Sequence, residues 1–239
     1  MLPRRIERPE DSSPEIVQSQ VPKIHEFHIT ESYLLTSKLL LAKWPDGRPA
    51  FNFVDLRRLS MSVARIEDEQ SIRYLLQNAK SLEKLHLSVE IVVGLHDILF
   101  PSARTLKVLD LKLYLDDDPD CVPLAWLCEE LEAMAGHNVL EVLSFEVQVD
   151  DDDAEDIIGC MMQKMEEIMI KPGWSALRQI SFEFPVECHY ISDEDREELS
   201  KGIQSLPDKY FSHLLKLESI AFSCSVYLVK EYEFNPTPF

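Results

Sequence analysis

The chain of 239 residues is 45% hydrophobic and 28% charged, which is typical of globular proteins that bury a core without disulfides or metal ions. The chain has a formal net charge of -19 at pH 7, so phosphate backbones would repel it, which excludes nucleic acid as a general partner. Because the sequence has no long apolar stretch and no secretory-type apolar segment behind its first arginines, we expect no membrane contact and a cytoplasmic or nuclear location.

The negative charge is concentrated in the second half of the sequence. Residues 1–120 contain 16 Lys and Arg against 19 Asp and Glu, a net charge of -3. Residues 121–239 contain 8 against 24, a net charge of -16. The second half therefore creates nearly all of the negative field.

The start of the chain differs in character from the rest. Residues 1–22 are rich in Pro, Ser, Arg and Glu with little periodicity, which predicts a disordered or loosely attached leader. Residues 23–239 are expected to form a single domain. Within it, Trp-Pro-Asp-Gly-Arg-Pro at residues 44–49 predicts a turn.

One apolar pattern recurs along this domain. Residues 82–89 have the pattern L-x-x-L-x-L-x-V, and the same positions are apolar in further copies at 56–63, 106–113 and 140–147. Two later copies contain aromatic and other apolar residues, at 177–184 and 217–224. A partial copy with Ile24, Phe27 and Ile29 precedes them all.

The spacing of these copies predicts alternating strands and helices. Each copy alternates apolar and polar residues in its second half, as a short strand does. Helices are expected at 67–80, 122–135 and 154–170, and Ser192 with Asp195 resembles the capping box of a further helix that Pro207 ends. Strand and helix repeated in this way predict an α/β solenoid of six or seven irregular repeats, with parallel strands on its concave face and helices on its convex face.

The L-x-x-L-x-L pattern resembles the strand signature of leucine-rich repeats over about residues 24–224. The Asn or Cys that usually follows the strand in that family is replaced here by Glu90, Tyr114 and Gln148. Residues 140–147 and 174–184 resemble the repeat portion of F-box/leucine-rich-repeat proteins of mushroom-forming, basidiomycete-type fungi. This resemblance implies a β/α horseshoe or arc that captures a target protein, with Skp1-cullin ubiquitin-ligase components as further partners. The family's F-box is not recognisable in this sequence, which puts the ligase link in doubt.

Stacking the copies aligns side chains in three columns on the exposed face of the predicted sheet. The first column contains Glu26, Arg58, Lys84, Val108, Val142, Gln179 and Ser219. The second contains His28, Ser60, His86, Asp110, Ser144, Ser181 and Ala221. The third contains Thr30, Ser62, Ser88, Lys112, Glu146, Glu183 and Ser223.

Solenoids commonly bind partners on such a face, although any solenoid must also present a polar face to water. Two exposed valines favour the middle of the sheet as the interface. The predicted partner-binding residues are Arg58, Lys84, His86, Val108, Asp110, Lys112, Val142, Glu146 and Glu183.

The rest of the sequence contains no convincing metal-binding or catalytic motif. The acidic runs at 116–120 and 150–153 lack the glycine and spacing of a calcium loop, and His25 and His28 should fall on opposite faces of a strand. The 5 cysteines are widely spaced without a C-x-x-C pair, which indicates reduced, mostly buried thiols, and the adjacency of Cys188 and His189 is no nucleophile and base arrangement. Phosphate loops and hydrolase elbows are missing from the sequence, so we expect no enzyme, no cofactor and no metal.

The leading hypothesis is therefore a non-catalytic protein-interaction module that binds through its concave strand face, related to the substrate receptors of F-box ligases. The alternative is an acidic scaffold or chaperone that attracts basic proteins through residues 121–239. An enzyme is a third hypothesis, and a relict or truncated member without activity is a fourth.

Overall fold

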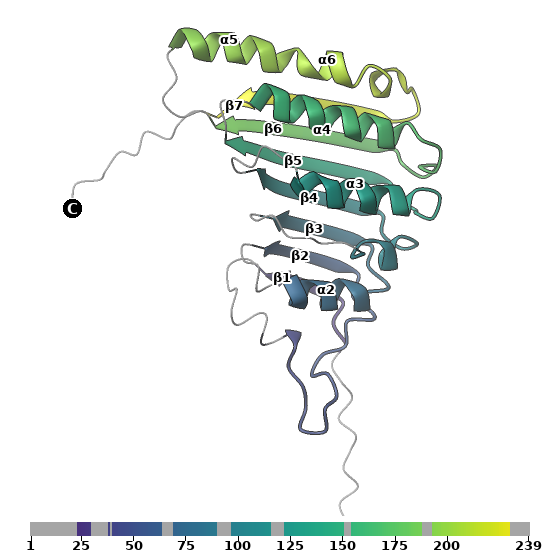
Figure 1. Cartoon of the computed structure of the whole chain (residues 1–239). Coiled ribbons are helices and arrows are strands. Elements are labelled where there is room, and N and C mark those ends of the chain that lie inside the picture. Colours follow the sequence, from purple (N-terminus) through teal and green to yellow (C-terminus); the bar gives the residue numbers. More distant parts are fainter. Residues whose placement is uncertain are drawn as a thin grey trace, which may run out of the picture.

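The computed structural model describes residues 23–29, 38, 40–63, 69–89, 97–115, 122–150, 154–187 and 193–229. The predicted leader, residues 1–22, lies outside them. Seven strands form one sheet in which every neighbouring pair is parallel and the spatial order follows the chain (Figure 1). The strands are β1 (Glu26–Ile29), β2 (Arg58–Val63), β3 (Lys84–Val89), β4 (Val108–Leu115), β5 (Val142–Asp150), β6 (Gln179–Glu187) and β7 (Ala221–Leu228).

Helices connect the strands and lie on one face of the sheet (Figure 1). The longer ones are α2 (Glu69–Asn78), α3 (Val122–Met134), α4 (Ala154–Met169) and α5 (Asp193–Gln204). The short ones are η2 (Phe100–Ser102), α6 (Leu206–Tyr210) and η3 (Leu214–Lys216). The predicted α/β class with a parallel sheet is confirmed. We call the sheet face opposite these helices the open face.

The helices predicted at 67–80, 122–135 and 154–170 are confirmed as α2, α3 and α4. A helix also follows Ser192, which itself lies outside the described residues. The prediction that Pro207 ends this helix is wrong, because α5 already ends at Gln204 and Pro207 lies in the first turn of α6. A proline is tolerated there because first-turn amides have no partner within the helix.

Strand register confirms the alignment of the apolar copies in all but the last strand. Leu59 pairs with Leu85, as predicted, and the same column continues through Leu109 and Leu143 to Ile180. The last strand lies two residues later than the apolar pattern predicts, because Ile180 pairs with Phe222 and not with Ile220. Residues 214–216 form η3, so the chain enters β7 later than the pattern predicts. The side chains keep their predicted faces because a strand has a period of two residues.

This shift corrects the last member of each predicted polar column. Ala221 takes the place of Ser219 beside Gln179, and Ser223 takes the place of Ala221 beside Ser181. In the third column Ser225 replaces Ser223, while Thr30 lies outside the described residues.

The core is formed by apolar side chains of the strands together with those of the helices. Apolar side chains of the strands alternate inward, as the burial of Leu85, Leu87 and Val89 in β3 shows. Near the end of the sheet, the ring of Phe182 stacks on those of Phe145 and Phe211, with ring centroids 5.2 and 4.9 Å apart. Such aromatic contacts add to the stabilisation that apolar burial gives.

Two carboxylates tie successive turns of the chain together. Glu130 of α3 is only 4% exposed and accepts the backbone N–H groups of Ile98 at 3.3 Å and Leu99 at 2.8 Å, where η2 begins. Glu166 of α4 accepts the N–H of His213 at 2.7 Å, where η3 begins. Both carboxylates satisfy amides that a helix start leaves unpaired.

The connection between α3 and β5 contacts the connection between α4 and β6. Asn138 donates to the carbonyls of Met134 at 2.9 Å and Gly173 at 3.0 Å, and its side-chain oxygen accepts the N–H of Leu140. Gly173 has a φ of 126°, and a Cβ there would lie 2.5 Å from the Gly136 nitrogen. Glycine is therefore needed for both conformation and close approach.

The turn predicted at 44–49 is confirmed. The N–H of Gly47 donates to the Trp44 carbonyl at 2.8 Å, and Gly47 has a φ of 84°. An antiparallel bridge joins Lys43 and Pro49 on either side of it. The glycine supplies the left-handed conformation that closes the turn.

Candidate functional site

The predicted partner-binding residues all belong to the alternate positions that face away from the core. Register places Arg58, Lys84, Val108 and Val142 in one column across β2 to β5. His86 and Asp110 share the next column, and Lys112, Glu146 and Glu183 share the third. The structure therefore brings them together on the open face, and their role in binding stays a prediction.

Side chains of neighbouring strands contact one another across this face. Arg58 lies 2.9 Å from Glu26, and His86 Nδ1 lies 2.8 Å from an Asp110 carboxylate oxygen. Lys84 stands between them without an ion-pair partner among the described residues. Among the described residues, Lys84 is therefore a cation of this face whose charge no ion pair offsets.

A more closely connected cluster lies on β4 to β6. Lys112 Nζ donates to Glu146 at 2.6 Å and lies 5.3 Å from the ring centroid of Tyr114. The hydrogen bond to Glu146 raises the pKa of Lys112, a contact with Tyr114 acts in the same direction, and burial opposes both. Lys112 is thus held in its charged form between an acid and an aromatic ring.

Tyr227 of β7 extends this cluster to the last strand. Burial raises the pKa of Tyr227, as do the negative charges of Glu183 and Glu146, while Lys112 lowers it. Tyr227 is 43% exposed. Four strands thus contribute aromatic, acidic and basic groups to one region of the open face.

Sequence reasoning missed a fourth column of the sheet. Tyr114 pairs with Gln148, and Pro185 pairs with Tyr227. Gln148 donates to Glu187 at 2.7 Å. The signal was present, because alternation of apolar residues continues past the end of the pattern in residues 140–149 and 177–186.

The two central valines are less exposed than predicted. Val108 and Val142 pair directly between β4 and β5 and are both half-buried. Beside them, Ser181 donates to the hydroxyl oxygen of Ser144 at 2.9 Å. The middle of the open face is therefore a small, mixed surface of methyl and hydroxyl groups.

Within the described ranges, the other acidic, histidine and cysteine side chains do not come together in a second candidate catalytic or metal-binding site. Residues 116–121, 151–153 and 188–192 lie outside them, which includes most of both acidic runs, Cys188 and His189. His25 contacts the backbone oxygen of Asp55 at 3.2 Å, and His28 is exposed on β1. In the described part of the chain, no three His, Cys, Asp or Glu side chains are placed to hold a metal ion.

The described cysteines are free thiols that are partly buried. Burial raises the pKa of Cys128 to about 11 and that of Cys224 to about 12. Nearly all of each thiol is therefore protonated at neutral pH, a state that is poorly nucleophilic.

Comparison with known proteins places the chain in no family. No family model matches it, and no curated protein or solved structure is significantly similar to it. Across the described residues, every helix is too short or too polar to cross a lipid bilayer.

Proposed function

We propose that the chain is a non-catalytic protein-interaction module, built as a leucine-rich-repeat-type solenoid, that binds a partner protein through the open face. The observation that carries this proposal is the asymmetry of the sheet. All described helices lie on one face (Figure 1), and the other face presents side chains from seven strands in continuous columns. Rigid strands hold these side chains in fixed positions, which reduces the entropy lost on binding.

The composition of the open face supports a protein partner. Tyrosine is enriched at energetically important positions of protein interfaces, because its ring buries a large area and its hydroxyl still forms a hydrogen bond. Tyr114 and Tyr227 flank the Lys112–Glu146 pair on β4 to β7. We expect this region to contribute most of the binding energy.

The resemblance to F-box/leucine-rich-repeat proteins supports a role related to substrate receptors. In such a role the open face would hold a target protein, and Skp1-cullin components would be recovered with it. Cytoplasm or nucleus is the compartment that fits this role.

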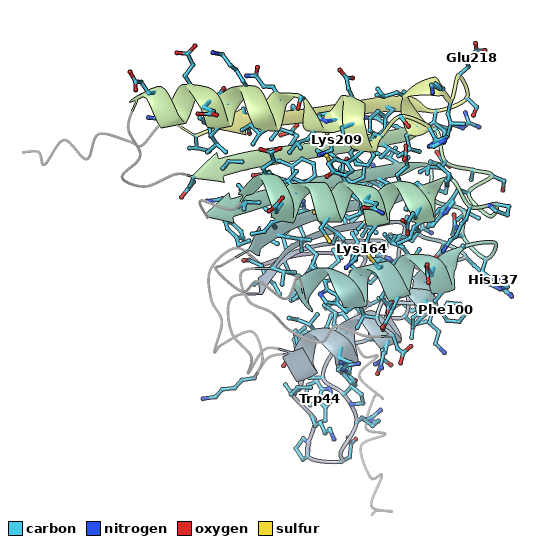
Figure 2. The ribbon with its side chains drawn as sticks, turned by 45° about the horizontal axis from the view of Figure 1, so that its top comes forward. Trp44, Phe100, His137, Lys164, Lys209 and Glu218 are labelled. Carbon is cyan, nitrogen blue, oxygen red and sulfur yellow. The ribbon has the colours of Figure 1, made fainter. Side chains whose placement is uncertain are left out.

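A matched pair of variants tests the proposal in a pull-down from extract of the source cells. The open-face variant changes Arg58, Lys84, Asp110 and Glu146 to Ala. The control variant changes Lys164, Lys201, Glu167 and Glu194 to Ala, which removes the same charges from exposed positions on the helices (Figure 2 labels Lys164).

Proteins that bind the open face should be recovered with wild type and control, but not with the open-face variant. Equal recovery with both variants, when both are folded by circular dichroism, would place the binding site elsewhere.

A second candidate function, an acidic scaffold for basic proteins, is favoured by the charge of -16 in residues 121–239. Exposed acids on α4 and α5, including Glu155, Glu194 and Glu197, contribute to that field. Attraction of this kind is screened by salt, whereas a packed interface persists. Recovery of basic proteins only, and only at low salt, would favour the scaffold.

A further inference from the structure

A groove of about 630 Å³ crosses the edge of the sheet where β1 to β4 begin. It is lined by side chains that immediately precede these strands and by residues of the preceding turns, so it is separate from the columns of the open face. Phe100 and His137, labelled in Figure 2, lie at the same edge of the molecule.

The backbone holds the lining residues in register. The carbonyl of Arg57 accepts the N–H groups of Glu83 at 2.8 Å and Lys84 at 2.9 Å, and the carbonyl of Glu83 accepts those of Lys107 and Val108 in the same way. Each residue before a strand is therefore fixed directly beside its neighbour in the next turn. A groove built on this ladder is already formed before any ligand arrives.

A side-chain bond strengthens the same edge. The hydroxyl of Thr105 donates to the carbonyl of Leu82 at 2.9 Å, which joins the turns that precede β3 and β4. Thr105 is itself part of the groove wall. The groove thus rests on backbone and side-chain bonds between successive turns.

The charge of the groove is opposite to that of the chain. Its acids are both paired, since Asp55 lies 2.9 Å from Lys23 and Glu83 lies 3.9 Å from Arg57. Arg104 and Lys107 are exposed and have no ion-pair partner among the described residues. Two uncompensated cations therefore face this groove in a protein whose net charge is -19.

We propose that this groove binds a carboxylate-rich segment of a partner protein, with Arg104 and Lys107 pairing with its acidic side chains. A guanidinium fork matches a carboxylate in bidentate geometry, and the ammonium of Lys107 supplies a second point charge. Val139, which is 37% exposed, offers an apolar surface beside them.

The dimensions of the groove suit a short extended segment. It crosses the starts of four strands, so three intervals of about 4.8 Å give a length of about 14 Å. An extended chain covers this distance with about four residues. A segment of that length can place two carboxylates against the two free cations.

The test measures fluorescence anisotropy of a labelled octapeptide of alternating Glu and Ser with the full-length chain, at low and physiological salt. The groove variant is R104E with K107E. The control is K164E with K216E, which changes the net charge equally at exposed positions on α4 and η3.

Wild type should bind the peptide at physiological salt, the groove variant should bind at least about tenfold more weakly, and the control should stay within about twofold of wild type. An equal loss in both variants would show that net charge alone attracts the peptide, and no binding by wild type would also overturn the proposal. If the charge reversal unfolds the chain, R104Q with K107Q replaces it.

Two further arms distinguish peptide binding in the groove from general anion binding and from binding at the open face. Inorganic phosphate at the same charge concentration should compete poorly, and equal competition would reduce the groove to a general anion site and overturn the assignment to a peptide. The open-face variant of the pull-down should bind the peptide as wild type does, so failure of one site can be distinguished from failure of the other.

Discussion

The two ends of the sheet are built differently. Toward the C-terminal end, the 9-residue strands β5 and β6 precede the edge strand β7, and Phe182 of β6 is 1% exposed, whereas Phe222 and Cys224 of β7 itself are partly buried. At the N-terminal end, β1 has only 4 residues, and its apolar side chains Phe27 and Ile29 are partly buried. Because apolar burial supplies most of the stabilisation of a core, the N-terminal strands should open first.

This difference bears on function. The aromatic and charged cluster around Lys112 and Tyr227 spans β4 to β7 and so crosses the well-packed strands β5 and β6. The cationic groove lies at the entry of β1 to β4, toward the thinner end. We therefore expect the open-face site to be rigid and the groove to depend more on the integrity of the N-terminal strands.

The largest expected effect compares two regions of the core. Phe182→Ala removes a ring that contacts several others, and should lower the free energy of unfolding by about 3–5 kcal/mol, measured by urea denaturation. Phe27→Ala removes a half-buried ring beside Phe53, and should cost less than about 2 kcal/mol. Equal losses would contradict the difference between the ends.

The next effect concerns the carboxylate that joins α3 to η2. Glu130→Gln keeps the size of the side chain but replaces one of the two carboxylate oxygens, each of which accepts a backbone N–H, with an NH2 group that cannot accept, and should cost about 1.5–3 kcal/mol. The control is Glu132→Gln on the same helix, where the ion pair with Lys171 is half-exposed and should cost less than about 1 kcal/mol. If Glu132→Gln lowered the free energy of unfolding as much as Glu130→Gln does, burial would not determine how much each carboxylate stabilises the fold.

A third prediction uses the thiols and pH. The pKa values of Cys128 and Cys224 are raised to about 11 and 12, above the unfolded value of about 8.5. The resulting stabilisation is fully present below pH 8.5 and is lost as pH rises through the folded pKa values. At pH 8, the lower thiolate fraction should make alkylation of both thiols at least about a hundredfold slower in the native chain than in urea, with Cys224 the slower of the two. Fast alkylation of Cys224 alone would show that the β7 edge opens more readily than the core.

The smallest expected effect on stability is at the open face. Lys112→Ala removes one ion pair and one ring contact, and should change the free energy of unfolding by less than about 1 kcal/mol. The same variant should weaken partner binding measurably, because interface positions affect affinity more than they affect folding. A large loss of stability without a change in binding would assign Lys112 a structural role only.

The sequence predicted most of the fold because one physical signal repeats. Period-two alternation identified strands β2 to β6 and their register, and helical spacing identified α2, α3 and α4. The entry of β7 was missed, because Leu217 continues the apolar pattern in sequence but is 36% exposed beside η3. A local apolar match cannot reveal where a short helix delays a strand.

The candidate site was predictable only in part, for a related reason. Alternation identifies which side chains face outward, so the columns of Arg58, His86 and Lys112 could be found. Contact between neighbouring side chains of one column depends on side-chain conformation, so the His86–Asp110 and Lys112–Glu146 contacts could not be predicted. The groove where the strands begin could not be predicted from the sequence. It is formed by turns, whose shape depends on hydrogen bonds between residues far apart in the sequence.

Titration of a partner recovered by the pull-down against Tyr114→Ala with Tyr227→Ala tests the proposed interface most directly. If the open face is the binding site, these substitutions should weaken binding at least about tenfold while the free energy of unfolding changes little. Unchanged affinity, together with weaker binding by the helix-face control, would contradict the proposal that the partner contacts the open face.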